Sequence, residues 1–214
     1  MKNLLITTLI SASVFLFSFR PGGYESAMKS ALDDMNNIKS LTDLVSIANK
    51  FDRIGAAEKN QWLPYYYSAY CYILMTTKEA DVAKWDEYLN IADINIGKSE
   101  KLEANMVEIL ALRGFSSMMR INVDPSVRGQ EYATKSVGYL QQASQLDDQN
   151  PRVILMMAQM QYGTAQFFGS DTAPICNQFK KAVELFDQEN SDSDSILPSW
   201  GKPQAQSMVK NCEG

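Results

Sequence analysis

A seven-residue pattern recurs four times along this chain of 214 residues. It consists of a large apolar residue, an alanine three positions later and, in most copies, another large residue three positions after the alanine. The copies are Val45-x2-Ala48-x2-Phe51, Leu89-x2-Ala92-x2-Asn95, Leu140-x2-Ala143-x2-Leu146 and Phe179-x2-Ala182-x2-Leu185. The alanines are 44, 51 and 39 residues apart. Such a period predicts stacked helical hairpins, in which a small residue lets neighbouring helices approach closely and large residues fill the space between them.

The rest of the chain also follows helical spacing. No segment alternates with a period of two residues, and none is rich enough in β-branched residues to predict a strand. We therefore expect an all-α fold of about eight or nine helices in antiparallel pairs, forming a single domain over residues 21–214. Asp124-Pro125 and Arg128-Gly129 predict a long loop between two helices, braced by an Arg–Asp ion pair. The alternative for this arginine is ligand capture.

The N-terminus has the pattern of an export signal. Lys2 is followed by an uncharged, mostly apolar run over residues 4–19 and then by Arg20-Pro21. This run is short for a membrane span, which needs about twenty residues, and a basic start before an apolar stretch is typical of a secretory signal peptide. We assign residues 1–20 to a signal peptide, with an uncleaved anchor as the alternative. The mature protein is then expected in the periplasm, without membrane insertion.

Composition and missing motifs exclude several functions. The net charge is −5, and an acidic surface repels phosphate, so we expect no nucleic-acid partner. The absence of histidine excludes Ser-His-Asp and Cys-His catalysis and the H-E-x-x-H zinc site. Neither G-x-x-x-x-G-K-[ST] nor G-x-G-x-x-G occurs. We therefore expect no enzyme, no cofactor and no metal; the alternative is an enzyme that uses carboxylates or Tyr and Arg side chains on an α-helical scaffold.

The chain has three cysteines. Cys176 falls in the first turn of a helix that is predicted to begin at Pro174, and Cys212 falls at the end of a short final helix. If these helices are antiparallel neighbours, both cysteines lie at the same level, and an oxidising compartment can join them. We therefore predict a Cys176–Cys212 disulfide, which constrains the unfolded chain by roughly 3–4 kcal/mol in the entropic model. Cys71 is expected to be a buried free thiol.

One segment resembles the junction between tetratricopeptide repeats. Residues 143–151, Ala-Ser-Gln-Leu-Asp-Asp-Gln-Asn-Pro, match the family's alanine-bearing second helix, its Leu-Asp-Pro-Asn-Asn type turn and the next helix start, although Asp148 stands where the family usually has proline. A wider pattern resembles a group of exported bacterial tetratricopeptide-like proteins, mostly uncharacterised. It comprises Met119, Asp124-Pro125, Arg128-Gly129, Tyr132, Asn150-Pro151-Arg152, Phe168-Gly169 and Leu197-Pro198-x-Trp200-Gly201. The resemblance implies a tetratricopeptide-like α-α superhelix of antiparallel helix pairs, whose first helices line a concave groove.

Seven side chains would line this groove if Ala69, Gly114 and Ala158 are the close-approach residues of three first helices. The seven are Tyr66, Tyr70, Glu108, Phe115, Arg152, Gln159 and Tyr162. Their rings would supply contact area and the arginine would bind a carboxylate, so we expect recognition of another protein or a peptide. The alternative is that the tyrosine-rich helix only fills the core. The methionines of the later first helices are likewise expected as core filler, with an adaptable binding surface as the alternative.

Overall fold

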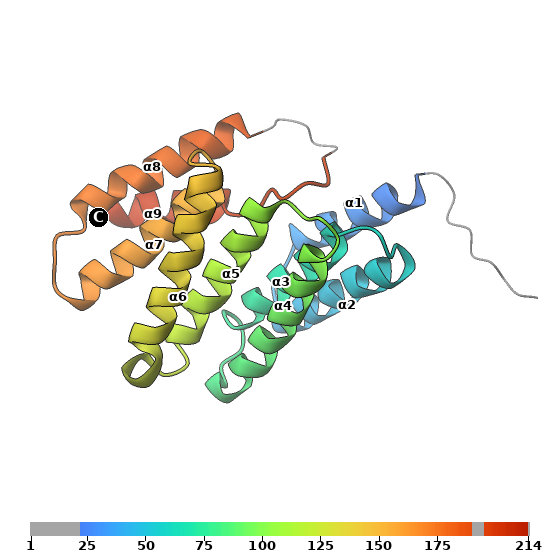
Figure 1. The fold of residues 1–214 in the computed structure, drawn as a ribbon, viewed down its shortest axis with the longest axis horizontal. Coiled ribbons are helices and arrows are strands. Elements are labelled where there is room, and N and C mark those ends of the chain that lie inside the picture. The colour runs from blue at the N-terminus through green and yellow to red at the C-terminus, as the bar shows by residue number, and fades with distance from the viewer. Residues whose placement is uncertain (1–21, 190–194, 214) are drawn as a thin grey trace, which may run out of the picture.

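A computed structural model describes residues 22–189 and 195–213 (Figure 1). Within these ranges the chain forms nine α-helices, one short 3-10 turn and no β-strand. They are α1 (Gly23–Met35), α2 (Leu41–Ala57), α3 (Leu63–Met75), η1 (Val82–Lys84), α4 (Trp85–Glu100), α5 (Met106–Ile121), α6 (Pro125–Leu146), α7 (Pro151–Phe167), α8 (Ala173–Gln188) and α9 (Lys202–Glu213). The all-α prediction is confirmed for this part of the chain. The expected signal peptide, residues 1–20, lies outside the described residues.

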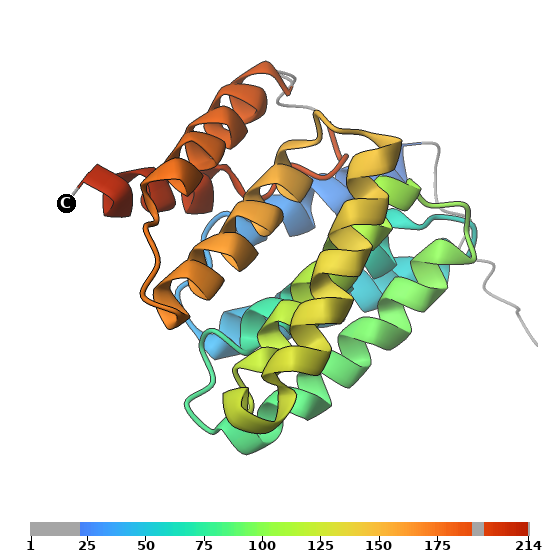
Figure 2. The same cartoon turned by 60° about the vertical axis from the view of Figure 1, so that its left-hand side comes forward.

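The helices stack in the order of the sequence. Each α-helix from α1 to α9 packs against the next, and α3 and α7 also contact α5 directly. The helices α3, α5 and α7 therefore form an inner layer, and α4 and α6 lie against it from outside (Figures 1 and 2). This is the arrangement of stacked hairpins; the more specific tetratricopeptide-like superhelix stays a prediction. No helix in the described ranges is both long and apolar enough to cross a membrane.

The repeated alanines lie inside the stack of helices. All four are completely buried: Ala48, Ala92, Ala143 and Ala182. Gly114 of α5 permits a close contact with α6, because a Cβ atom at this position would lie 2.8 Å from the side chain of Leu140. The large residues of the pattern differ more in their burial, since Val45 and Leu146 are exposed. The small residues of the pattern therefore identify the helix contacts better than the large ones do.

Side-chain caps define the starts of α2 and α7. Ser40 and Asp43 form a reciprocal capping box at the start of α2. At the start of α7, the Asn150 side chain accepts hydrogen bonds from the backbone N–H groups of Arg152 and Val153, while Pro151 has no N–H to satisfy. This cap places Arg152 in the first turn of α7, where its side chain is buried.

The prediction of a long loop around Asp124 and Arg128 is wrong. The carboxylate of Asp124 accepts a hydrogen bond from the backbone N–H of Val127 and caps α6, which begins at Pro125. Arg128 lies inside this helix and forms two hydrogen bonds of 2.7 Å with the carboxylate of Asp86 in α4. The arginine therefore joins α6 to α4, and the proline marks the first turn of a helix, a position that it tolerates well.

The C-terminal arm, residues 195–213, returns across the inner layer (Figure 2). Its first part, residues 195–201, is non-helical and is called the strap below. The second part, α9, packs on α8. Cys176 of α8 and Cys212 of α9 form a disulfide with their Cα atoms 5.9 Å apart, and Cys71 is buried and free. Both cysteine predictions are confirmed.

Candidate functional site

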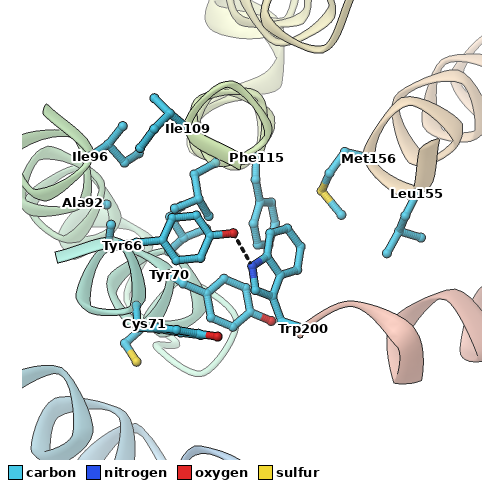
Figure 3. Close-up of a cluster of buried hydrophobic side chains, with 14 of the residues drawn as sticks. Tyr66, Tyr70, Cys71, Ala92, Ile96, Ile109, Phe115, Leu155, Met156 and Trp200 are labelled. Atoms are coloured by element: carbon cyan, nitrogen blue, oxygen red, sulfur yellow. Dashed lines mark hydrogen bonds between the residues drawn. The ribbon is translucent and has the colours of Figure 1, made fainter. Parts of the chain in front are cut away.

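The strap inserts one large side chain, Trp200, into the inner layer (Figure 3). The residue is only 5% exposed. Its ring stacks on Tyr70 of α3 with a centroid distance of 4.6 Å and lies 6.0 Å from the ring of Phe115 in α5. Leu155 and Met156 of α7 lie on the other side of the indole in Figure 3. Trp200 therefore fills the space between the three inner helices.

A chain of hydrogen bonds fixes the indole. The Trp200 Nε1–H donates to Tyr66 Oη at 2.7 Å, and Tyr66 Oη donates to Glu108 Oε2 at 2.7 Å. Burial is the main cause that raises the pKa of Tyr66 well above its usual value, and the charge of Glu108 adds to it. The phenol therefore stays neutral and can serve as donor and acceptor at once.

The hydrogen-bond chain continues into a buried ion network. Arg152 Nε donates to both carboxylate oxygens of Glu108 at 2.9 Å, and its Nη1 donates to Glu189 Oε2 at 2.6 Å. Asn150 Nδ2 donates to Glu108 Oε1 at 2.8 Å. Burial opposes the charge of Arg152, but the two carboxylates outweigh this effect and raise the pKa of the guanidinium. The network thus joins α5 to the start of α7 and to Glu189, which directly follows α8.

A hydrogen bond and a glycine fix the path of the strap. Tyr67 Oη donates to the backbone oxygen of Leu197 at 2.6 Å. Gly201 has a φ of 110°, which side chains rarely adopt, and a Cβ atom there would lie 2.7 Å from the ring of Phe186. The glycine after Trp200 is therefore required both by the backbone turn and by the lack of space.

An open cavity of about 510 Å³ lies between α3, α5, α7 and the first turn of α9. We call it the aromatic cavity, because aromatic rings and methionines form much of its wall. These are Tyr70, Phe115, Met118, Met119 and Tyr162. Leu74 and a set of amide and small residues complete the wall, and none of the described residues that line it is charged. The cavity therefore suits a ligand that is itself largely apolar.

A second cavity of about 540 Å³ is lined by another part of the strap, Leu197, Pro198 and Ser199. Its wall is polar and includes Glu108 and Arg152. These two charged groups are paired with each other, and the wall of this polar cavity also contains the charged side chains of Lys29, Asp33, Asp147 and Glu189. The strap lines both cavities: residues 197–199 line the polar cavity and Gly201 lines the aromatic cavity. Trp200 stands between them in the sequence.

The structure distributes the seven predicted groove residues over three environments. Four line the aromatic cavity: Tyr70, Phe115, Gln159 and Tyr162. Glu108 and Arg152 line the polar cavity, and Tyr66 lines neither cavity and has no exposed surface. The ring of Tyr66 is part of the core. For this residue the structure therefore agrees with the alternative given above, that the tyrosine-rich helix fills the core and does not line a groove. Peptide binding by these residues stays a prediction.

Trp200 is the component of the site that sequence reasoning missed. It stands in a short segment with Pro198 and Gly201, after a polar stretch, and this pattern entered only as part of a family resemblance. A tryptophan in a short connection that also contains Ile196 and Leu197 is itself a signal, because so large a ring is rarely left in solvent. Met118 and Met119 fit the adaptable binding surface that we gave as the alternative for the methionines.

The aromatic cavity offers few groups that could bind a metal. In the described part of the chain no three His, Cys, Asp or Glu side chains are placed to hold an ion. The cavity wall does contain the phenol groups of Tyr70 and Tyr162 and the thioether sulfurs of two methionines. Burial raises the pKa of Tyr70 and keeps its phenol neutral. The wall is therefore better suited to stack on a flat ring system than to hold an ion.

In the part of the chain that the structure describes, the site and fold define an all-helical protein with an aromatic cavity beside its inner layer. No protein-family model matches the chain, and no curated protein matches it. Among solved structures it is similar to the HusA haemophore from Porphyromonas gingivalis, with a TM-score of 0.78 and 27% sequence identity over 91% of this chain and 95% of that chain. This likeness fits the expectation of an exported helical binding protein, and it does not identify a tetratricopeptide repeat.

Proposed function

We propose that this protein is an exported carrier that binds an apolar, planar ligand of the tetrapyrrole class in the aromatic cavity. The observation that carries the proposal is the uncharged wall with the rings of Tyr70, Phe115 and Tyr162, on a fold shared with a haemophore. The cavity volume of about 510 Å³ falls within the range of about 300–1,000 Å³ that is usual for small-molecule sites. A porphyrin is flat and largely apolar, so it can stack on Tyr162, which is only partly buried, and contact the small exposed parts of Tyr70 and Phe115 beside Trp200.

The ring of the ligand, rather than an iron atom, is proposed to supply the binding energy. Haem iron is held in proteins by His, Cys, Met or Tyr side chains, and this chain has no histidine. Its one free cysteine, Cys71, is buried outside the cavity lining. The wall does offer Met and Tyr side chains, but the thioether sulfurs of Met118 and Met119 are weak acceptors, and the phenolate form of Tyr70 is disfavoured, because burial raises the pKa of this group. Tyr162 is the remaining phenol of the wall, and its contribution to binding as an iron ligand is proposed to be small. An iron-free porphyrin should therefore bind with an affinity within about tenfold of that for haem, a difference of about 1.4 kcal/mol.

Titration with protoporphyrin IX and with haemin, followed by porphyrin absorbance and by tryptophan fluorescence, tests the proposal. The decisive variant is Gly163→Phe. Gly163 lines the cavity, and an added Cβ would have open space around it, so a side chain can start here and its phenyl ring should occupy part of the opening. We expect the variant to bind both porphyrins at least about tenfold more weakly.

Gly97→Phe in α4 is the matched control. Gly97 is also helical and also has open space around its Cβ position, but it does not line the cavity. Both substitutions replace a helical glycine and so improve helix propensity to a similar extent. Equal binding by the two variants would refute the site, and absence of binding by the unmodified protein to either porphyrin would refute the ligand class.

Recognition of a protein partner is the second candidate function. It is favoured by Phe167 and Phe168 at the end of α7, which are 81% and 73% exposed and lie ring to ring at 5.1 Å. Exposed aromatic side chains are enriched in protein interfaces. The variant Phe167→Ser/Phe168→Ser should lose partner capture from an envelope extract and keep porphyrin binding. Unchanged capture would remove this candidate.

Both candidates are binding functions, and we propose neither a catalytic role nor a nucleic-acid partner. We also propose the periplasm as the location, which is supported by the disulfide between Cys176 and Cys212, because oxidising compartments maintain such bonds. Cell fractionation with alkylation of free thiols tests this point. Recovery of both cysteines as free thiols from intact cells would contradict it.

A further inference from the structure

One wall of the aromatic cavity is not part of the inner helix layer. Gly201 of the strap and Pro203 and Gln204 in the first turn of α9 form this wall. The remaining lining residues belong to α3, α5 and α7 or directly follow α3 and α5, and these helices contact one another directly. The size and access of the cavity therefore depend on where α9 lies.

The helix α9 has a small apolar contact of its own. It packs on α8, and Ala205 is its one fully buried residue in the part of the chain that the structure describes. Met208 and Val209 are only partly buried against the core. An isolated helix of this length is marginally stable in water, so α9 needs an additional anchor to keep its place.

Two anchors lie at its two ends. Trp200, immediately before α9, is held in the inner layer by Tyr70 and Tyr66. At the other end, Cys212 in the last turn is bonded to Cys176 in the first turn of α8. Both bonded cysteines are only half-buried, so a small reductant can reach the bond.

We propose that the Cys176–Cys212 disulfide is a redox latch on the aromatic cavity: its reduction by a dithiol frees α9 from α8, opens the cavity wall and speeds release of the ligand. The ligand-release part rests on the proposed function, whereas the movement of α9 does not. Cys71 takes no part, because it is buried in the core and burial raises the pKa of its thiol.

The chemistry of the latch is thiol–disulfide exchange. One thiolate of the dithiol attacks a sulfur of the bond and displaces the other cysteine as a thiolate, which leaves a mixed disulfide. The second thiolate of the reductant then displaces the remaining protein sulfur. The protein gains two electrons and two protons as two thiols, and the dithiol becomes a cyclic disulfide.

Release of haemin to excess apomyoglobin, measured by stopped-flow absorbance, tests the latch. Three samples are compared: the oxidised protein, the protein reduced with dithiothreitol, and the variant Cys176→Ser/Cys212→Ser. We expect release from the reduced protein and from the variant to be at least about tenfold faster, equivalent to about 1.4 kcal/mol. Dithiothreitol added to the variant should change nothing, which controls for effects of the reductant elsewhere.

Hydrogen exchange of the ligand-free protein gives a readout that does not depend on haemin. Reduction should remove protection from the amides of α9 and leave those of α5 and α7 protected. Unchanged protection of α9 overturns the latch, as does equal release from oxidised and reduced protein. Loss of protection throughout the chain also overturns it, because the bond would then stabilise the whole fold. If the oxidised protein binds no porphyrin, the proposed function fails, and exchange of α9 alone decides whether the bond holds this helix.

Discussion

Replacing Trp200 by alanine should destabilise the protein by about 3–5 kcal/mol, the usual cost of emptying a buried tryptophan site. The magnitude follows from three observations. The residue is only 5% exposed, its ring stacks on Tyr70 at 4.6 Å, and its N–H donates to Tyr66 at 2.7 Å. Since a domain of this size changes its Tm by about 2–4 °C per kcal/mol, the Tm should fall by about 6–20 °C.

Two further variants divide this effect into its parts. Trp200→Phe keeps an aromatic ring but removes the donor to Tyr66. Its loss of stability should therefore be smaller than that of Trp200→Ala, and the missing hydrogen bond should account for about 1 kcal/mol of it. Trp85→Phe is the control, because Trp85 also donates its N–H, to the backbone oxygen of Glu79 at 3.0 Å, but it is partly exposed and lies outside the inner layer. We expect its cost to be about 1 kcal/mol or less.

Urea and thermal unfolding, followed by far-ultraviolet circular dichroism with the disulfide intact, measure these differences. Trp200→Ala should also leave a fully folded protein at 25 °C with native helix content. A loss below about 1 kcal/mol for Trp200→Ala would refute the reasoning, because a ring that is packed between three helices cannot be removed at so low a cost.

Three other substitutions probe the surroundings of the site. Arg152→Met leaves the Glu108 carboxylate buried without its cation and should cost about 3–5 kcal/mol in urea unfolding; a loss below about 1 kcal/mol would contradict the network. Gly201→Ala forces a side chain into a backbone conformation with φ 110° and into an occupied space, so its Tm should fall, and an unchanged Tm would show that the strap can relax. Hydrogen bonds from Arg128 lower the pKa of Asp86 in the folded protein. The stability that this ion pair adds to the fold is therefore fully present above the unfolded-state pKa of about 3.9, and it is lost as the pH falls through the lower folded-state pKa. Arg128→Gln should therefore lower stability at neutral pH, by less than about 1 kcal/mol at this partly exposed pair, and by a smaller amount at about pH 2; an equal loss at both pH values would contradict this origin.

The sequence predicts most of the fold because the relevant signals are local. The alanines at Ala92 and Ala143 mark helix contacts through spacing alone, and helix direction places Cys176 opposite Cys212. The start of α6 was missed because Asp124-Pro125 is equally typical of a loop and of a capped helix start. The choice between the two depends on the ion pair from Arg128 to Asp86, which lies in another hairpin.

The site is less predictable because it depends on contacts between distant parts of the chain. Tyr66 and Trp200 are 134 residues apart, and no periodicity relates them. The groove hypothesis considered the helices alone and so left Tyr66 and Tyr70 open to a partner. Tyr66 is completely buried and accepts a hydrogen bond from Trp200 of the chain's own strap, whereas Tyr70 and Tyr162 still line the aromatic cavity.

The most direct test of the central claim is a methyl NMR spectrum of protein labelled with 13C at the methionine methyl groups, recorded while protoporphyrin IX is added. Met118 and Met119 line the aromatic cavity, whereas Met28 is buried in α1 and does not line it. Ring currents of a porphyrin that lies in the cavity should shift the signals of Met118 and Met119 strongly and leave that of Met28 in place. Binding without such shifts at Met118 and Met119, or shifts confined to other methionines, would contradict the assignment of the cavity as the ligand site.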